Sequence, residues 1–282
     1  ASASAAEGVG LFRTELLYLS AKTQPTSAVQ AASYEEILRA APAGPIVVRT
    51  IDAGSDKPVP FLNMGHEENP ALGVRGYRLI EDHRDFIIDQ LESLELARQA
   101  SGREVWVMAP MIATASEALE FAELARSAGN FKVGIMVETP SIVYQIPALQ
   151  GKLDFISVGT NDLSQYLFAA DRMNPALGAM LNPWQPGLIG ALKQISDACA
   201  AAGIYSGVCG ESASDPAFAV LLAGMGFDSV SSSRSQVGAV RQALSAVSKE
   251  QAKEVLTAAL TGSNAEEAKS NALGVLSAIS EN

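Results

Sequence analysis

The chain has 282 residues, of which 48% are hydrophobic and 18% are charged. This composition supports a packed core and excludes an intrinsically disordered chain. Lysine and arginine number 20 against 31 aspartate and glutamate, so the formal net charge is −11 at pH 7. This acidic balance argues against broad binding to nucleic acid or to anionic membranes, and an anionic substrate would need a local cluster of arginines.

Short runs rich in Val and Ile alternate along the chain with longer amphipathic stretches. Each run has four to six residues and is apolar almost throughout, which is typical of a strand that is covered on both faces. The predicted strands are residues 8–12, 45–49, 105–108, 132–137, 153–158, 204–208 and 227–230.

The amphipathic stretches between these runs predict helices. From residue 233 onward the sequence predicts two or three further Ala-rich helices, with a break near residues 261–263. Strands that alternate with helices at this spacing indicate βα units and a parallel sheet. The predicted helices before the tail are residues 27–40, 84–100, 116–128, 187–202 and 215–224.

Seven predicted strands come close to the eight of a (β/α)8 or TIM barrel. The first strand follows directly on residues 2–6, which resemble the end of a helix. We therefore predict an α/β protein with one TIM-barrel domain over residues 1–282, lacking its first strand and carrying extra C-terminal helices. The chain is expected to be part of a longer protein.

Cysteine and histidine are both scarce. Cys199 and Cys209 are too few for a disulfide scaffold and fit a reducing compartment. His66 and His83 exclude a His-rich zinc site. No apolar run approaches the roughly 20 residues of a membrane helix, and the first residues lack the basic and apolar regions of a secretory signal. We therefore expect a cytoplasmic protein.

Reactive or charged residues follow five of the predicted strands, where the chemistry of such barrels lies. Any one of them has a structural explanation, such as a surface ion pair or a helix start. Five such events at five strand ends are not explained in this way. The residues are Arg13, Arg49, Glu138, the pair Asn161 and Asp162, and Cys209.

The residue types suit an anionic substrate and a metal ion. The carboxylates of Glu138 and Asp162 offer hard oxygen ligands to one Mg²⁺, which commonly keeps several waters. Arg13, Arg49 and Arg172 have planar guanidinium groups, each of which could bind two oxygens of a phosphate or carboxylate at once. This set favours a small, doubly anionic substrate.

Two further side chains add chemistry to this set. Asn161 supplies a neutral hydrogen-bond donor, and Cys209 could move a proton. Glycines on both sides of Cys209, at positions 207 and 210, would expose its sulfur. Cys199 lies in a predicted helix and is interpreted as a small core residue. The combination points to a substrate with a carbonyl or an enol.

Seven segments carry a resemblance to a known family. They are EGVGLFRTELLYL (7–19), VVRTIDAGSDKP (47–58), ENPALGVRGYRL (68–79), MAPMIATASE (108–117), GIMVETP (134–140), DFISVGTNDLSQYLFAADRMNP (154–175) and GVCGESASDP (207–216). With them the chain resembles the C-terminal, phosphoenolpyruvate-binding domain of Enzyme I, the phosphoenolpyruvate–protein phosphotransferase of the bacterial sugar phosphotransferase system. The segments occur in family order over roughly the first four-fifths of the chain.

The resemblance assigns the substrate contacts. It implies that Arg13, Arg49 and Arg172 bind phosphoenolpyruvate. It also implies that Asn161 and Asp162 form the Asn-Asp pair that contacts the substrate.

The resemblance also implies the metal ligands and the proton donor. Glu138 and Asp162 match the ligands of Mg²⁺, and Cys209 corresponds to the family's proton donor to C3 of the enolate. Lys57 and Arg75 lie in matching motifs and are secondary candidates.

The family reaction moves the phosphoryl group of phosphoenolpyruvate to a histidine and then to a small phosphocarrier protein, releasing pyruvate. His66 and His83 lie in polar segments, and neither matches the family's phosphohistidine motif. The acceptor histidine is therefore expected in a separate N-terminal domain of the longer protein. The resemblance further implies a homodimer.

Three places depart from the family pattern, namely residues 180–190, Ser55 and the Ser-rich residues 230–235. These departures concern the detailed shape of the substrate site and the surface of the expected dimer. Three alternatives stay open: a domain of the pyruvate phosphate dikinase or phosphoenolpyruvate synthase type, a Mg²⁺-dependent pyruvate aldolase or lyase, and a non-catalytic phosphoenolpyruvate sensor.

Overall fold

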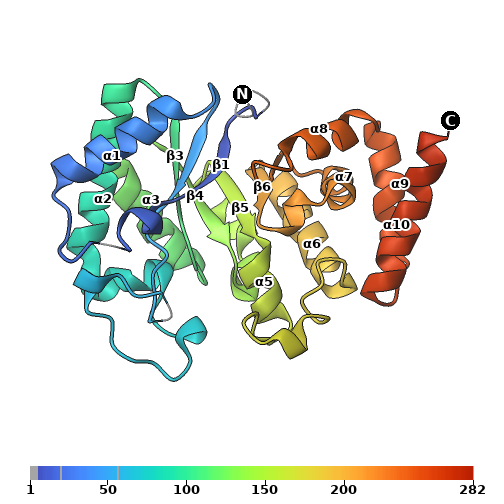
Figure 1. Ribbon diagram of the computed structural model, residues 1–282, viewed down its shortest axis with the longest axis horizontal. Helices are drawn as coiled ribbons and strands as arrows, with labels where there is room; N and C mark the ends of the chain where they lie inside the picture. Colours follow the sequence, from blue (N-terminus) through green and yellow to red (C-terminus); the bar gives the residue numbers. More distant parts are fainter. Residues whose placement is uncertain (1–5, 20, 56, 282) are drawn as a thin grey trace. The chain divides into compact units, whose positions relative to one another are not determined.

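The computed structural model describes residues 6–281 apart from residues 20 and 56 (Figure 1). The described residues form two compact units. The first contains residues 6–136 with 152–154, and the second contains residues 137–151 with 155–281.

The first unit contains a parallel sheet of strands β1 to β4 in chain order. β2 and β3 are buried along their whole length, as their Val-rich sequences predict. β1 is half-buried, pairs with β2 alone within this unit, and has a register irregularity between Val9 and Phe12. The strands are β1 (Val9–Arg13), β2 (Ile46–Arg49), β3 (Val105–Ala109) and β4 (Lys132–Val137), whose last residue belongs to the second unit.

Three helices of the first unit connect these strands, namely α1 (Ser27–Ala40), α2 (Ile80–Ser101) and α3 (Ala115–Ala128). α1 and α2 pack side by side (Figure 1). α3 begins at a capping box. The backbone N–H of Glu117 donates to the hydroxyl of Thr114, and the backbone N–H of Thr114 donates to the carboxylate of Glu117. Short 3-10 turns at Thr14–Leu17, Pro60–Leu62, Pro70–Leu72 and Gly76–Leu79 occupy the segments that follow β1 and β2.

The second unit contains the parallel strands β5 (Phe155–Gly159), β6 (Tyr205–Cys209) and β7 (Ser229–Ser231), again in chain order. Its core includes α7, whose sequence PAFAVLLAGM is apolar on every side and mostly buried. The helices are α4 (Pro140–Val143), α5 (Thr160–Leu167), α6 (Pro186–Ala202), α7 (Pro216–Met225), α8 (Val237–Ser245), α9 (Lys249–Leu260) and α10 (Ala265–Ser280), with 3-10 turns at Ile146–Leu149, Pro175–Leu177 and Ser212–Ser214.

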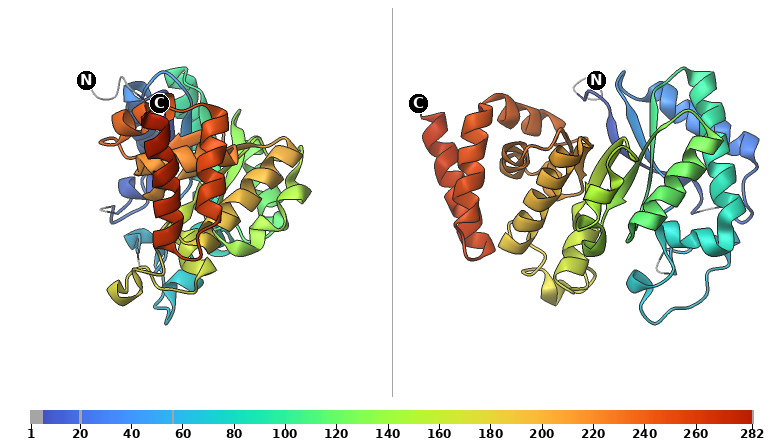
Figure 2. Two further views of the ribbon diagram at one scale, coloured as in Figure 1. Left: turned by 90° about the vertical axis from the view of Figure 1, so that its right-hand side faces the viewer. Right: turned by 180° about the vertical axis from the view of Figure 1, so that it is seen from behind.

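The C-terminal tail of the second unit ends in a helical hairpin. α9 and α10 lie side by side in both views of Figure 2, and α9 also packs on α7. The break between them falls at residues 261–264, where the sequence analysis expects it. The tail therefore contains α8, α9 and α10, which is the upper of the two helix numbers predicted.

Parallel strands in chain order, separated by helices, are the arrangement of a TIM barrel, so the predicted fold class is confirmed. Seven strands occur among the described residues, the number that the sequence predicts. Burial on both faces does not hold for β1 and β7, which are half-buried. Of the helix end predicted at residues 2–6, residues 2–5 lie outside the described part, and Ala6 is not helical.

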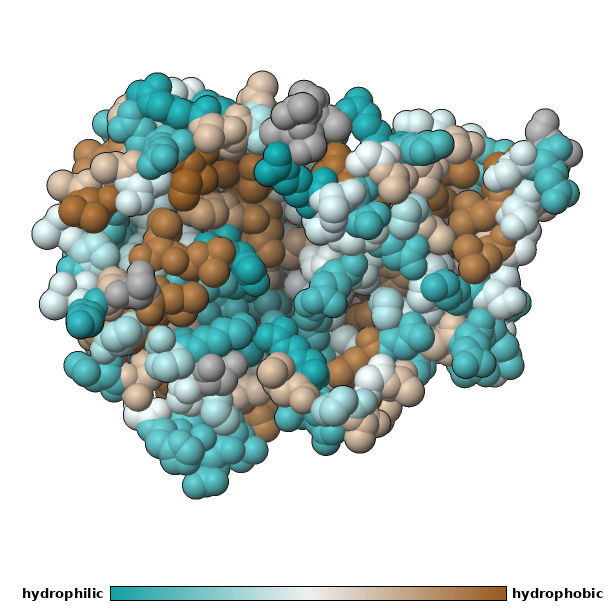
Figure 3. Space-filling view, in the orientation of Figure 1, coloured by the Kyte–Doolittle hydropathy of each residue, from teal (hydrophilic) through white to brown (hydrophobic). Residues whose placement is uncertain are grey.

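The start of α2 and the presence of the short helix α4 and of α5 differ from the prediction. α2 begins four residues earlier than expected, and its first turn is kinked at His83, whose φ is −131°. α5 was not predicted, so Asn161 and Asp162 lie in the first turn of a helix rather than in a loop. Among the described residues, no helix has the length and apolarity needed to cross a membrane. The face drawn in Figure 3 is largely hydrophilic, with apolar patches between polar side chains.

Candidate active site

Arg49 lies at the end of β2, buried between two carboxylates. Its Nη2 is 2.8 Å from Oε1 of Glu15, and its Nη1 is 2.9 Å from Oδ2 of Asp52. Its Nη1 also donates to the sulfur of Met136 at 3.7 Å. Only 5% of Arg49 is exposed. Charge-assisted bonds from both sides fix the plane of this guanidinium before any ligand arrives.

Asp52 is shared by a second buried arginine. Nη2 of Arg75 is 3.2 Å from each carboxylate oxygen of Asp52. Burial alone would raise the pKa of Asp52, but the charges of Arg49, Arg75 and Lys57 outweigh it and lower the pKa. Asp52 is therefore ionised at neutral pH and balances part of the positive charge that follows β2.

Arg13 behaves differently from Arg49. It ends β1, its side chain is 53% exposed, and its Nε is 3.9 Å from Oε1 of Glu15. An exposed guanidinium with one long ion pair is restrained weakly by its own contacts. The first unit thus contains a buried cluster of alternating charges, with Arg13 at its exposed margin.

Glu138 and Asp162 are the two predicted metal ligands, and both lie in the second unit. Glu138 follows β4 directly, is 1% exposed, and stands two residues before α4. Asp162 lies in the first turn of α5, where the helix dipole favours a negative charge, and is 5% exposed. α4 contacts α5, so the helix that begins two residues after Glu138 packs against the helix that carries Asp162.

Arg172 and Asn161 are tied to this part of the second unit. Nη1 of Arg172 donates to Oδ2 of Asp162 at 3.2 Å, and the backbone N–H of Arg172 donates to Gln165 at 3.0 Å. Oδ1 of Asn161 accepts from the backbone N–H of Glu211 at 3.4 Å, which links the start of α5 to the turn after β6.

Cys209 ends β6 and is 2% exposed. Its Sγ accepts from Oγ of Ser157 and donates to the carbonyl of Val158, each at 3.4 Å. The parallel register pairs Cys209 with Gly159, the residue before α5. The thiol therefore lies next to the strand end from which Asn161 and Asp162 begin. The prediction that flanking glycines expose the sulfur is not fulfilled in this structure, since Cys209 is buried.

The donor set of the second unit fits one Mg²⁺. Glu138 and Asp162 are buried carboxylates, and Mg²⁺ is usually held by one or two carboxylates with the remaining positions filled by water or substrate oxygens. No group of three or more His, Cys, Asp or Glu side chains suited to a metal occurs among the described residues.

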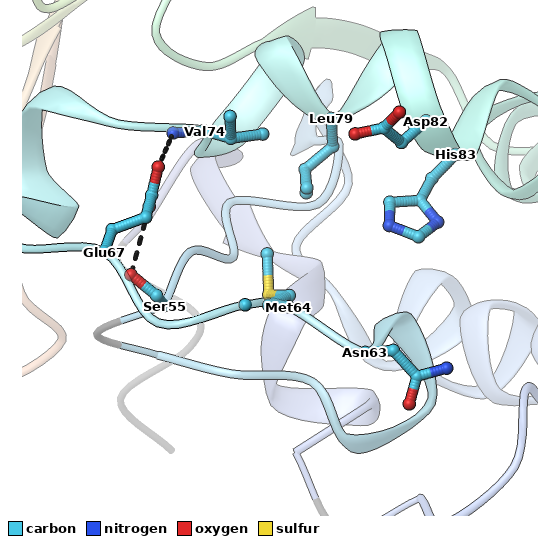
Figure 4. A pocket seen from close by; sticks show the side chains of 9 residues that line it. Ser55, Asn63, Met64, Glu67, Val74, Leu79, Asp82 and His83 are labelled. Carbon is cyan, nitrogen blue, oxygen red and sulfur yellow. Dashed lines mark hydrogen bonds between the residues drawn. The ribbon is translucent and has the colours of Figure 1, made fainter.

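A separate pocket lies in the first unit and does not include any of the residues of the predicted site (Figure 4). Glu67 spans one side of it, accepting from Oγ of Ser55 at 3.0 Å and from the backbone N–H of Val74 at 2.8 Å. His83 and Asp82 line the other side. Ser55, which departs from the family pattern, is thus occupied in holding a loop.

The structure brings the predicted site residues together in two groups. Arg13 and Arg49 belong to the first unit, and the other predicted residues belong to the second. Sequence reasoning missed Glu15 and Asp52 as partners of the arginines. A signal was present, because an acid follows each arginine by two or three residues. Arg75, a secondary candidate, joins Arg49 through Asp52, and Lys57 adds its charge to the same carboxylate.

A family comparison identifies the class of protein. The model of the PEP-utilising enzyme, PEP-binding domain family matches residues 1–249, and the chain belongs to this family.

Full-length relatives make the resemblance more specific. The phosphoenolpyruvate-protein phosphotransferase of Streptomyces coelicolor is 44% identical over 276 residues, covering 96% of this chain and 49% of the relative. The phosphoenolpyruvate-protein phosphotransferase of Haemophilus influenzae is 37% identical over 272 residues, covering 92% of this chain and 47% of the relative. The resemblance to Enzyme I is confirmed, and the chain spans about half the length of these relatives. A solved citrate lyase from Burkholderia xenovorans is similar over 92% of this chain and 90% of its own, with a TM-score of 0.47 and 14% identity.

Proposed function

We propose that this chain binds phosphoenolpyruvate with Mg²⁺ and supports transfer of the phosphoryl group to a histidine in another domain, as the first step of a bacterial sugar phosphotransferase system. Pyruvate is the second product. The observation that carries the proposal is the position of the predicted residues. With the exception of Arg172, all of them end a parallel strand or lie within three residues of its carboxyl end.

The arginines bind the anionic groups of the substrate in this proposal. Arg13, Arg49 and Arg172 bind the phosphate, while Asn161 and Asp162 complete the substrate contacts. Arg49 is already held by two carboxylates, so little side-chain freedom is lost when it meets an anion. Exposed Arg13 adds a positive charge that the buried ion pairs do not cancel.

Glu138 and Asp162 would hold the metal ion. When bound, Mg²⁺ supplies positive charge that neutralises phosphoryl and enolate oxygens. The ion pair with Arg172 holds the carboxylate of Asp162, on α5, in one orientation. Phosphoryl transfer depends mainly on positioning and on charge stabilisation, and these side chains provide both.

Cys209 completes the reaction by moving a proton. After the phosphoryl group has left the enolate oxygen, the S–H proton of Cys209 passes to C3 and forms the methyl group of pyruvate. The thiolate that remains takes a proton from solvent. In the reverse direction the thiolate removes a methyl proton. The hydrogen bonds from Ser157 and to Val158 support this role, because they fix the direction of the thiol.

The partners in this proposal follow from the family. They are a phosphohistidine domain of the longer protein, a small phosphocarrier protein and a second copy of the chain in a homodimer, all in the cytoplasm. The match covers only 49% and 47% of the two relatives, so about half of each relative lies outside it and is long enough to contain such a domain.

Calorimetric titration of phosphoenolpyruvate tests the metal and substrate assignments. The parent chain should bind phosphoenolpyruvate in the presence of Mg²⁺, and Glu138→Gln should lose this metal-dependent binding because one buried carboxylate ligand is gone. Glu254→Gln, an exposed change on α9, is the matched control and should bind as the parent does. Equal binding by Glu138→Gln and the parent would remove Glu138 from the site, and no binding by the parent would overturn the proposed function.

A further inference from the structure

Gln90 is a polar side chain with no exposed surface, in the middle of α2. Its Oε1 accepts from the backbone N–H of Ile51 at 2.9 Å. Its Nε2 lies 3.1 Å from each of three oxygens, those of Thr14, Tyr18 and Tyr34. One amide on a helix therefore contacts the segment after β1, helix α1 and the segment after β2.

The orientation of this amide is fixed by its partners. The backbone N–H of Ile51 can only donate, so the oxygen of the Gln90 amide must face it and the nitrogen must face the hydroxyls. Burial raises the pKa of Tyr18 to about 12 and that of Tyr34 well above its ordinary value, so both phenols stay protonated at neutral pH. The two hydroxyls also bond to each other, and Tyr18 donates to Gln30.

These contacts reach the two arginines that end β1 and β2. Thr14 directly follows Arg13, and its hydroxyl donates to the carbonyl of Arg49 at 2.9 Å. Ile51 lies between Arg49 and Asp52 in sequence. Gln90 thus binds Thr14, which is next to Arg13, and Ile51, which is two residues after Arg49, and Thr14 in turn bonds to Arg49.

Core packing alone does not account for a glutamine here. A buried amide is costly unless its hydrogen bonds are made, and an apolar side chain of similar volume would fill the space. We propose that Gln90 is a positioning residue, which holds the segments after β1 and β2 at the spacing that Arg13 and Arg49 need in order to bind one phosphate. This inference rests on the proposed function, which assigns phosphate binding to both arginines.

Arg13 is the residue most sensitive to this arrangement. Arg49 is held by its own buried ion pairs, whereas the half-exposed Arg13 has a 3.9 Å ion pair, so its position depends on the backbone around Thr14. A displacement of about 1 Å in a binding group is enough to lose a large part of its effect. Loss of the Gln90 amide should therefore weaken phosphoenolpyruvate binding without removing any group that contacts the ligand.

The test compares Gln90→Leu with Leu94→Ala, a change at another fully buried position of α2. Both variants should lower the melting temperature. At a temperature where both are folded, Gln90→Leu should bind phosphoenolpyruvate with Mg²⁺ about tenfold more weakly than the parent, and Leu94→Ala should bind with parental affinity. Equal weakening in both variants would show a merely structural role and overturn the proposal.

A second readout does not depend on the ligand. Hydrogen exchange at the amide of Ile51 should be faster in Gln90→Leu and remain slow in Gln90→Glu, which keeps an oxygen for that N–H. Gln90→Glu should nevertheless bind phosphoenolpyruvate more weakly than the parent, as Gln90→Leu does, because its carboxylate cannot donate to Thr14. Unchanged exchange at Ile51 in Gln90→Leu would overturn the proposal even if the parent failed to bind phosphoenolpyruvate, a result that would separately overturn the proposed function.

Thr14→Val keeps the inference testable if Gln90→Leu does not fold. This change preserves the shape of the buried side chain and removes the hydroxyl that joins Gln90 to the carbonyl of Arg49. It should weaken phosphoenolpyruvate binding to a similar extent, and parental affinity would count against the link.

Discussion

Asp52 balances the charge of two buried arginines, and its removal has a defined pH signature. Its pKa in the folded chain is below the ordinary value of 3.8, because Arg49, Arg75 and Lys57 outweigh the effect of burial. A carboxyl whose pKa falls on folding stabilises the fold fully above its unfolded pKa, and this stabilisation is lost as the pH falls through the folded value. Asp52→Asn should therefore destabilise the chain by about 3–5 kcal/mol at neutral pH.

Urea unfolding of the parent and of Asp52→Asn at several pH values checks this prediction. The difference in the free energy of unfolding should be constant above about pH 4 and should shrink as the pH falls below 3.8. Asp85→Asn, an exposed change in the same unit, should show almost no difference at any pH. A difference that stays constant into strong acid would contradict the lowered pKa.

Replacing each cysteine in turn tests whether Cys209 is the proton carrier. Cys209→Ala should bind phosphoenolpyruvate nearly as the parent does but should not exchange the methyl protons of pyruvate in deuterated buffer, because the proton carrier is gone. Cys199→Ala is the control: burial raises the pKa of Cys199 to about 12, so its thiol stays protonated and inert. Proton exchange followed by NMR at the parental rate in Cys209→Ala would remove this residue from the mechanism.

Residue types at strand ends could be predicted because the C-terminal ends of parallel strands carry the chemistry of such barrels. Arg13, Arg49, Glu138 and Cys209 were predicted in this way, and each of them ends a strand or directly follows one. The partner of a charge is harder to predict, since Glu15 and Arg49 are 34 residues apart and meet only once β1 pairs with β2. Gln90 gives no sequence signal at all, because a lone glutamine on an amphipathic helix is typical of an exposed position.

At the scale of elements, strands and long helices follow from local patterns, whereas turns at the site do not. The start of α5 shows why. Its first residues, TND, are poor helix formers, yet Thr160 is held by Ser212 at 2.8 Å and by the carbonyl of Cys209 at 3.4 Å. Tertiary contacts thus select a helix that local propensity does not predict, and they place Asp162 in its first turn.

The turn after β6 explains one glycine of the GVCGE motif. Gly210 has φ of +121°, a backbone conformation that other residues rarely adopt, and a Cβ there would approach Oγ1 of Thr160 to 2.5 Å. Glycine therefore lets the chain turn close to α5 directly after Cys209. The sequence predicts that this glycine exposes the sulfur, whereas in the structure it permits the backbone turn.

At the scale of the whole molecule, the proposed function assigns binding and proton transfer to this chain and also requires a phosphoryl acceptor, a role for which neither described histidine is suited. The side chain of His66 is 87% exposed and 3.8 Å from Glu68. His83 lies at the kink in the first turn of α2, beside the separate pocket. An acceptor must be aligned with the phosphoryl group within a water-excluding site, whereas His66 is exposed and the separate pocket beside His83 includes none of the predicted site residues.

We therefore predict that this chain, incubated with phosphoenolpyruvate and Mg²⁺, gains no stable phosphohistidine and releases no pyruvate. Adding the part of the Streptomyces coelicolor relative that lies outside the match should start pyruvate release, because that part would supply the acceptor. Intact-mass measurement and an assay of pyruvate follow the two outcomes, and Cys209→Ala with the same addition serves as the control for slow ketonisation of the enolate. A phosphoryl group on His66 or His83 in the isolated chain would show that the acceptor is not confined to another domain, and pyruvate release without the added part would lead to the same conclusion.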